Sequence, residues 1–553
     1  MATGDVRLVF PAFGAWLAVV VALCAPWGVA LGAVVVLIAS GVAGWIVADR
    51  YGRRRLAATL LGVCGVSATA GIAVLVRISA VDASPVSGIE GKPVVELEVT
   101  GDPSILGGGV RAMVPVKVVA VSGSPTRPVD AQLGLQASDL PDLLPGERIS
   151  VRVRASPPRG GPRDRLTVAR LSAVGELRVV RQAPVWQRWA GTVRSRLRES
   201  SSHALDPRAA GLLPGLVLGD VGNLDPVVRQ QFRAAGLSHL TAVSGANFSL
   251  VVGAVVLGVR LVGVPTRPTV ALGLLATVGF VVLVRPSDSV LRAAIMGSVG
   301  LVAALGSRRA QALPALGAAV VLIMLAWPQM ALAPGFLLSV VATLGLVLWA
   351  TPIRFALAAR GIPDALATLL AMTVAAQILT TPVLMLVAGQ VSLVSVPANL
   401  LVAPVIAPIG LLGTLAALIG AIGPPGGAAA VVAELLLRAT TPEMWWLLSC
   451  AEWFGTPSWA SMTVPGWQAV VVLALAAVFG RWCWVVRRDA STAGRTVTTA
   501  LSVSNLRHPR TRDPELPSLI ETVDGEVVDV RPASLAKRSA RGPSANGRPP
   551  RLR

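Results

Sequence analysis

The stretch GLSHLTAVSGANFSLVVGAVV, residues 236–256, is long and apolar enough to enter a lipid bilayer, yet it is rich in polar side chains. Those side chains are Ser238, His239, Thr241, Ser244, Asn247 and Ser249. On a helix they do not form one stripe, because Asn247 lies roughly 80° and Ser244 about 140° round from His239 at about 100° per residue. An unpaired polar group in hydrocarbon costs free energy. We therefore expect protein or water around this segment, or a break between Ser244 and Gly245; packing of small and hydroxyl side chains between helices is the alternative.

The composition agrees with a membrane location. Of 553 residues, 54% are hydrophobic and only 14% are charged, whereas soluble domains average about 25% charged residues. The sequence predicts a polytopic α-helical membrane protein with about twelve transmembrane helices. The net charge of +20 is not evidence for nucleic acid, since cytoplasmic loops of membrane proteins collect Arg and Lys. The four cysteines lie in or beside apolar stretches at no metal-ligand spacing, which indicates buried thiols.

An N-terminal membrane block is expected over residues 1–77. Three apolar runs, near 6–25, 28–48 and 56–76, each approach the roughly 20 residues that a bilayer requires. The first run continues as a hairpin without a cleavage signature, which is typical of an uncleaved anchor. The basic loop DRYGRRR at 49–55 is predicted to be cytoplasmic, which places the N-terminus inside and the chain after Arg77 outside.

A small extracytoplasmic β domain is expected over residues 78–182. Apolar and polar residues alternate in short segments at 94–99, 113–121, 148–155 and 168–181, which is typical of strands with one buried face. An oligonucleotide/oligosaccharide-binding (OB) type barrel is one option.

One strand of this domain carries candidate nucleic-acid-binding residues. Arg148, Arg152 and Arg154 alternate with apolar residues, so they are predicted to share an exposed face that could neutralise phosphates. A solvated polar face is the alternative, because residues 79–182 contain no Tyr, Phe or Trp to stack on bases.

Residues 183–235 are expected to form interfacial amphipathic helices. In WQRWAGTVRSRLRES, residues 186–200, one helical face carries apolar residues and the remainder carries arginines, among them Arg194. This combination favours a helix in the lipid headgroup layer; a packed linker helix is the alternative.

A second membrane block is expected over residues 236–486, followed by a disordered basic cytoplasmic tail over 487–553. Its expected spans lie near 236–260, 268–285, 288–306, 311–327, 332–350, 364–388, 392–406, 407–423 and 466–486. If 391–423 forms two spans, every arginine-containing loop of this block falls on the cytoplasmic side, and so does the C-terminus. One long span or a re-entrant pair is also compatible with that stretch.

Several short motifs follow one another in a fixed order around the opening stretch. They are Gly219-Asp220, GLSH and AVSG within 236–245, RAAIM at 292–296, PGFLLS at 334–339, QILTTP at 377–382 and ANLLVAP at 398–404. Over about residues 205–425, this series resembles the central membrane domain of the ComEC family, the inner-membrane channels for transforming DNA in naturally competent bacteria. The N-terminal spans and the external β domain match the usual order of that family.

The resemblance implies a set of channel-lining or functional candidates. They are Asp220, His239, Ser244, Gly245, Asn247, Arg292, Gln377, Pro382 and Asn399. Each also has a structural alternative: Arg292 can pair with Asp288, four residues earlier, and Gln377 and Asn399 can form interhelical hydrogen bonds.

The chain departs from the family pattern in two respects. Family members often have His two positions after the Ser-Gly, where this chain has Asn247. Many members also end in a metallo-β-lactamase-like domain, which needs several His and Asp as zinc ligands. This chain has only His203, His239 and His508, so no metal, no cofactor and no enzymatic activity are expected, and a nuclease would be a separate protein.

The expected function is that of an inner-membrane channel component that passes single-stranded DNA into the cytoplasm. Its expected partners are the DNA strand, the lipid bilayer, a separate nuclease, a periplasmic DNA receptor, a cytoplasmic motor and further copies of itself. An outside motor or a gradient is expected to supply the energy for movement, because the chain has no Walker A pattern. The rivals are a transporter of another anionic or small polar solute and a membrane-anchored binding or scaffold protein.

Overall fold

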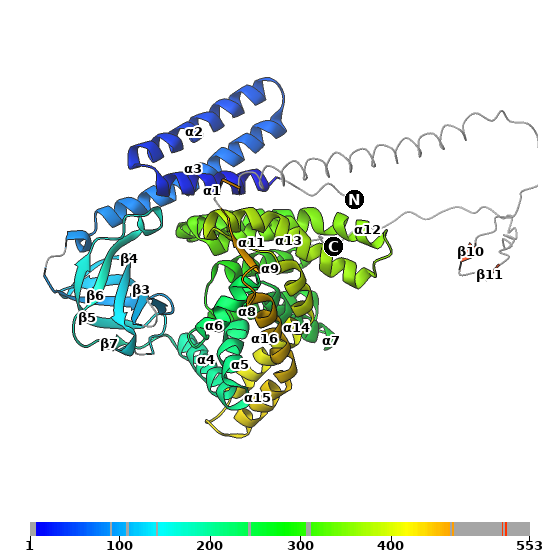
Figure 1. Ribbon diagram of the computed structural model, residues 1–553. Helices are drawn as coiled ribbons and strands as arrows, with labels where there is room; N and C mark the ends of the chain where they lie inside the picture. Colours follow the sequence, from blue (N-terminus) through cyan, green and yellow to red (C-terminus); the bar gives the residue numbers. More distant parts are fainter. Residues whose placement is uncertain are drawn as a thin grey trace, which may run out of the picture. The chain divides into compact units, whose positions relative to one another are not determined.

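The computed structural model describes residues 7–88, 91–106, 110–139, 142–241, 245–305 and 311–464, with the short pieces 467–468, 522–523 and 526–527. The chain divides into two compact units, Met1–Phe479 and Gly480–Arg553. In the second unit, β10 (Thr522–Val523) pairs with β11 (Glu526–Val527). The expected span at 466–486 and the tail at 487–553 otherwise lie outside the described residues. All further features belong to the first unit (Figure 1).

Three N-terminal helices form where the sequence predicts them. They are α1 (Val9–Cys24), α2 (Trp27–Arg50) and α3 (Arg54–Asp82), and α3 packs against both of the others. Small residues allow this close packing: a methyl group added at Gly41 would lie 2.7 Å from the Cys64 Cβ. The Trp16 indole Nε1 donates to the Ala331 carbonyl oxygen at 3.0 Å, which joins α1 to the second half of the chain.

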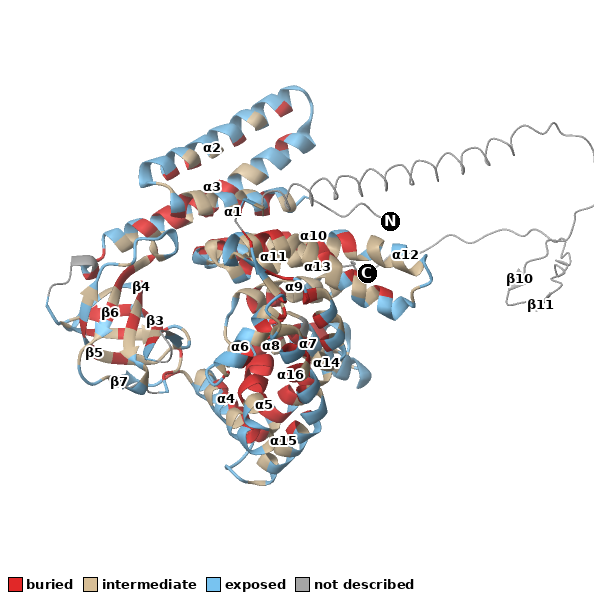
Figure 2. Ribbon diagram, viewed as in Figure 1, coloured by how far each residue is buried: buried red, intermediate tan, exposed pale blue. Residues whose placement is uncertain are grey.

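A sheet domain follows α3, and its strands carry the predicted alternation of buried and exposed residues. The strands are β1 (Val94–Val99), β2 (Ser104–Leu106), β3 (Arg111–Val121), β4 (Ser124–Gln136), β5 (Arg148–Ser156), β6 (Thr167–Ala173) and β7 (Arg178–Arg181), with 3₁₀ turns η1 (Pro85–Gly88), η2 (Ala137–Asp139) and η3 (Pro162–Asp164). β3 pairs antiparallel with β1 and β4, and β6 pairs parallel with β4 and antiparallel with β5. β5 also pairs with β1 and β7. Apolar side chains such as Val95, Leu97 and Val114 form the buried interior (Figure 2).

Helices α4 (Val185–Ala204), α5 (Pro207–Leu218) and α6 (Pro226–Ala234) connect the sheet domain to the turn η4 (Ser238–Leu240). α5 and α6 begin in the same way, because Asp206 and Asp225 accept backbone N–H groups and a proline follows each of them. α4 packs against α5, α8, α14 and α15. This packing corrects one expectation: Arg194, which the helical pattern placed on the polar face, is only 6% exposed.

The second membrane block contains the remaining elements of this unit. They are α7 (Gly245–Leu261), α8 (Thr266–Val284), α9 (Asp288–Leu305), α10 (Ala312–Ala326), η5 (Pro328–Leu332), α11 (Pro334–Gly345), the π-helical turn η6 (Leu346–Ala350), α12 (Thr351–Ala358), α13 (Asp364–Ala388), β8 (Gln390–Ser392), α14 (Ser395–Gly420), α15 (Ala428–Ala439), α16 (Thr441–Gly455) and β9 (Ser461–Thr463). The two spans expected at 392–406 and 407–423 are one continuous helix, α14, which contains Pro404 and Pro408. α15 and α16 lie outside the expected spans.

Within the described part of the chain, seven helical segments are long and apolar enough to cross a membrane. They are Trp27–Arg50, Arg54–Asp82, Thr266–Val284, Asp288–Leu305, Pro334–Ala358, Asp364–Ala388 and Ser395–Gly420. Shorter apolar helices include α1, α5 and α10. The fold is therefore that of a polytopic helical membrane protein with a small sheet domain between α3 and α4.

Candidate functional site

Two of the sequence motifs meet at Arg292 of α9. The Arg292 Nε donates to the Ser339 hydroxyl of α11 at 2.6 Å, and its Nη1 lies 3.4 Å from the Met296 sulfur. A methyl group added at Gly245, the first residue of α7, would lie 3.1 Å from the other terminal nitrogen of Arg292 and 3.3 Å from the Ala293 Cβ. A glycine at position 245 therefore leaves room for a guanidinium beside the start of α7.

The carboxylate of Asp288 has a different partner from the one expected. It accepts the backbone N–H of Phe336, and a methyl group added at Gly335 would lie 2.7 Å from one of its oxygens. Asp288 thus stabilises the first turn of α11, where N–H groups lack helical partners. Among the described residues, no ion pair joins Asp288 to Arg292.

A second polar group connects α13 to α14. The Ser395 hydroxyl donates to the Gln377 side-chain oxygen at 2.9 Å, and the Gln377 amide donates to the Thr381 hydroxyl at 3.1 Å. The Asn399 amide donates to the Ser395 carbonyl oxygen at 2.7 Å. Pro382 is buried in α13, directly after Thr381. Gln377 and Asn399, which are 22 positions apart in the sequence, therefore lie in one hydrogen-bonded chain.

The opening stretch of the sequence lies beside this second group. Gly236 adopts a φ of +74°, and a methyl group there would lie 2.6 Å from the Ser395 Cβ, so the loop approaches α14 as closely as only glycine allows. Ser238 and His239 follow and are both exposed. Ser244 lies outside the described residues. Gly236, two residues before η4, thus brings this loop against the start of α14.

Asn247 occupies a different environment from His239. It is 6% exposed, and its amide nitrogen donates to the Leu216 carbonyl oxygen of α5 at 2.8 Å. A methyl group added at Gly410 of α14 would lie 3.4 Å from its side-chain oxygen. Asn247 therefore joins three helices in the interior of the block.

A cluster of five charged residues lies between the sheet domain and helices α4, α5 and α8. The Arg194 guanidinium of α4 is 3.0 Å from Asp102 and 3.9 Å from Asp220, and it donates to the Leu218 carbonyl oxygen at 2.8 Å. Arg198 is 3.1 Å from the same Asp220 carboxylate. Asp220, which the resemblance alone made of interest, therefore belongs to a partly buried ion network.

Arg285 completes this cluster from the loop between α8 and α9. It forms an ion pair with Asp102 and has a φ of 71°, a strained conformation for a residue other than glycine. Burial lowers the pKa of Arg285 to about 10, although Asp102 opposes the shift, so the guanidinium stays charged at neutral pH. Sequence analysis missed Asp102, Arg194 and Arg285, because three separate segments supply them and none stands in a motif.

The structure exposes two of the three arginines that were predicted to share a face of β5. Arg152 and Arg154 are exposed on either side of the buried Val153, whereas Arg148 is partly buried and lies 3.3 Å from the Glu98 carboxylate of β1. β7 contributes two further arginines, because Arg178 pairs with Ser150 and Arg181 with Arg148 in the ladder.

Within the described ranges, no three or more His, Cys, Asp or Glu side chains are grouped so that they could hold a metal ion. We call the group of Arg292 with Ser339 and the group of Gln377, Ser395 and Asn399 the two motif clusters. Their polar groups are amides, hydroxyls and one guanidinium, which act as hydrogen-bond partners.

The comparisons with known proteins agree with the motif order. Residues 216–489 match the family model described as "Competence protein", a range that contains both motif clusters. ComE operon protein 3 of Bacillus subtilis (strain 168) is 27% identical over 214 residues, which are 38% of this chain and 27% of the relative. The match thus spans little more than a quarter of that relative's length, and no solved structure matches the chain. With its apolar helices and its ordered motifs, the chain is a membrane protein of the competence protein family, the ComEC family.

Proposed function

We propose that this chain is a channel component of the inner membrane, through which single-stranded DNA enters the cytoplasm during natural competence. The family match supports this proposal. The observation that carries it is the convergence of separate motifs on two polar groups between otherwise apolar helices: Arg292 with Ser339, and Gln377 with Ser395 and Asn399.

The chemistry of these groups suits a strand that must move. A polyanion can cross hydrocarbon only along a polar, hydrated path. The start of a helix such as α7 carries partial positive charge, and Arg292 lies beside its first residue, so both attract phosphates. Amide and hydroxyl groups such as Gln377, Ser395 and Asn399 offer hydrogen bonds that are readily exchanged, whereas a row of arginines would hold the strand.

We also propose that the sheet domain is an OB-type barrel on the outer side of the membrane. The pairing pattern supports a barrel, because each of β1, β3, β4, β5 and β6 has two partners in this set and only β4 with β6 is parallel. The N-terminus would then be cytoplasmic, with domain limits near 77, 182, 235 and 486. Because α14 is one helix where two spans were expected, the alternation of arginine-containing loops no longer supports a cytoplasmic C-terminus. A receptor, a nuclease and a motor would be separate proteins, and copies of the chain could assemble.

Uptake of labelled duplex DNA by a strain that lacks this chain tests the proposal. We expect nuclease-resistant internal label to disappear in that strain and to return with the wild-type gene. Normal uptake without the chain would favour a transporter of another solute.

Complementation with a Gln377→Leu/Asn399→Leu variant tests whether the membrane block takes part in passage. We expect uptake at least about tenfold lower, equivalent to about 1.4 kcal/mol, at equal protein level. The control is Thr373→Val on α13, whose exposed hydroxyl donates to the Leu369 carbonyl oxygen of the same helix. Equal uptake by both variants would favour a membrane-anchored scaffold.

A further inference from the structure

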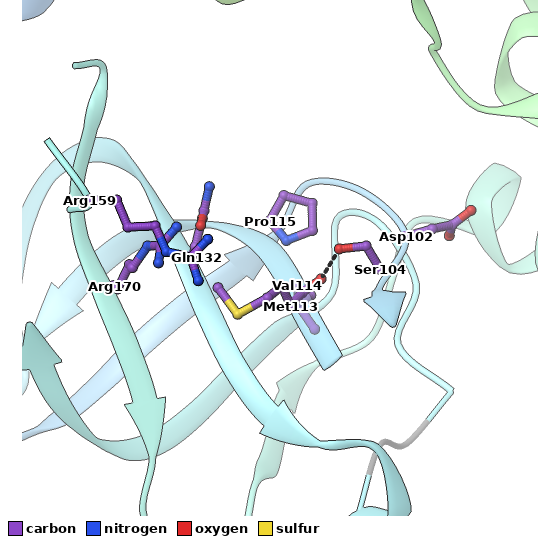
Figure 3. A pocket seen from close by; sticks show the side chains of 8 residues that line it. All are labelled: Asp102, Ser104, Met113, Val114, Pro115, Gln132, Arg159 and Arg170. Carbon is purple, nitrogen blue, oxygen red and sulfur yellow. Dashed lines mark hydrogen bonds between the residues drawn. The ribbon is translucent and has the colours of Figure 1, made fainter. Parts of the chain in front are cut away.

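The sheet domain contains a cavity of about 310 Å³, which lies outside the range of the family match and away from both motif clusters. Its size is at the lower end of ligand pockets, which hold roughly 300–1,000 Å³. Side chains from β2, β3, β4 and β6 and from neighbouring loops line it (Figure 3): Asp102, Ser104, Met113, Val114, Pro115, Gln132, Arg159 and Arg170.

The charge of this lining is positive. Arg159 and Arg170 lie together at one end of the cavity, while Asp102 lies at the other end (Figure 3). The Asp102 carboxylate is already paired with Arg194 and Arg285. Two guanidinium groups therefore dominate the electrostatics of the opposite end, where the Gln132 amide adds further hydrogen-bonding capacity.

Arg170 has hydrogen-bonding capacity that the protein leaves unused. Its Nε is buried and has no hydrogen-bond partner among the described residues, and its terminal nitrogen is 3.7 Å from Asp164. A buried donor without a partner costs about 1–3 kcal/mol and is expected to have a reason, such as a missing ligand. Planar guanidinium groups match the oxygens of a phosphate particularly well.

We propose that this cavity binds a backbone phosphate of single-stranded nucleic acid through Arg170 and Arg159. The inference rests on the proposed function, because it names the contact by which the sheet domain would hold an arriving strand. The lining contains no aromatic side chain, so bases have no ring on which to stack. The site therefore holds the backbone without regard to sequence, as a channel for arbitrary DNA requires.

The test measures binding of fluorescent oligo(dT) and mixed-sequence strands to the full-length protein in nanodiscs of zwitterionic lipid. For Arg170→Gln, we expect about tenfold weaker binding of both strands and a slope of log K against log salt that is smaller by about 0.7, the value for one phosphate on a single strand. Arg170→Lys should recover part of the affinity. The matched control is Asp164→Asn, which removes the carboxylate partner of Arg170 but leaves the positive charge of Arg170 in place. This variant should bind both strands as tightly as the wild type or more tightly.

Unchanged affinity and salt slope in both Arg170→Gln and Arg159→Ala would overturn the inference. Equal weakening by Asp164→Asn would also overturn it, because the loss would then come from the fold of the loop. Absence of strand binding, together with binding of anionic lipid vesicles by the wild type but not by Arg170→Gln, would assign the cavity to a lipid headgroup instead. If only these binding results fail while the deletion strain still loses uptake, the proposed function stands without this site; if the deletion strain takes up DNA normally, the function itself fails.

Discussion

At the scale of single residues, Arg194 is a buried arginine with two carboxylate partners and a carbonyl partner. Its buried guanidinium faces Asp102 and Asp220 and donates to the Leu218 carbonyl oxygen. Each of the two carboxylates also has a second partner, Arg285 for Asp102 and Arg198 for Asp220. The loss of Arg194 therefore costs mainly the hydrogen bond to the Leu218 carbonyl oxygen and one of two ion pairs per carboxylate.

We predict that Arg194→Ala lowers the free energy of unfolding by about 1–3 kcal/mol, because the buried Leu218 carbonyl oxygen loses its donor while both carboxylates keep one arginine. Thermal unfolding of the detergent-purified protein measures the effect. Arg188→Ala is the control on the same helix, because Arg188 is exposed and donates to the neighbouring Gln182; it should change stability by less than about 0.5 kcal/mol. Similar melting temperatures for the two variants would contradict a buried network.

The sequence predicted the motif residues better than it predicted this network. Gly245, Arg292, Gln377 and Asn399 stand in motifs whose order indicated a common membrane domain, and the structure brings them into two groups. Arg194 looked like one of several arginines on an amphipathic helix, because helical periodicity alone cannot show which elements cover that helix.

At the scale of elements, the packing of α11 against α13 depends on glycine. α11 ends at Gly345, directly before the π-helical turn η6, and a methyl group there would collide with the backbone oxygen of Ala375. Turns of this type often mark functional positions in helices.

We predict that Gly345→Ala lowers stability by about 1–3 kcal/mol, because two helix backbones must separate. Gly279→Ala is the control, since a methyl group at Gly279 of α8 would meet open space; it should be neutral or stabilise by up to about 1 kcal/mol. The melting temperatures of both variants measure the effect. A Gly345→Ala protein with the melting temperature of the wild type would contradict the prediction, because α11 and α13 would then accommodate the methyl group without loss of stability.

Helix α14 explains why the element count was uncertain. Pro404 and Pro408 normally favour a break, yet the 26-residue helix continues through both. Its length of about 39 Å exceeds the roughly 30 Å hydrocarbon core, which a tilted helix can accommodate. Hydropathy locates such apolar stretches, but whether a proline ends a helix depends on neighbours that the sequence does not identify.

At the scale of the whole molecule, side chains of the sheet domain bind the helices at several points. Asp102 pairs with Arg194 and Arg285, and Arg165 donates to the Leu23 and Ala25 carbonyl oxygens at the end of α1. These contacts would keep the proposed phosphate site in a fixed place relative to the membrane block.

We predict that Asp102→Asn weakens this attachment, because two buried guanidinium groups lose their shared carboxylate. Amide hydrogen exchange should rise in the loop that contains Asp102 and around Arg285. Glu98→Gln is the control, since Glu98 pairs with Arg148 inside the sheet domain; its exchange should change only locally. Identical exchange near Arg285 in both variants would contradict the anchoring role.

The most direct measurement of DNA passage uses strands that carry a thiol-reactive group, supplied during uptake to cells whose chain has one cysteine in an otherwise cysteine-free background. His239 and Leu257 form a matched pair of positions, because both are exposed. His239 follows Gly236, which approaches Ser395 of the polar group on α14, whereas Leu257 lies on the apolar helix α7. If DNA passes along the proposed path, we expect DNA adducts at His239→Cys and none at Leu257→Cys. Absence of adducts at His239→Cys during normal uptake, or equal labelling of both positions, would contradict it.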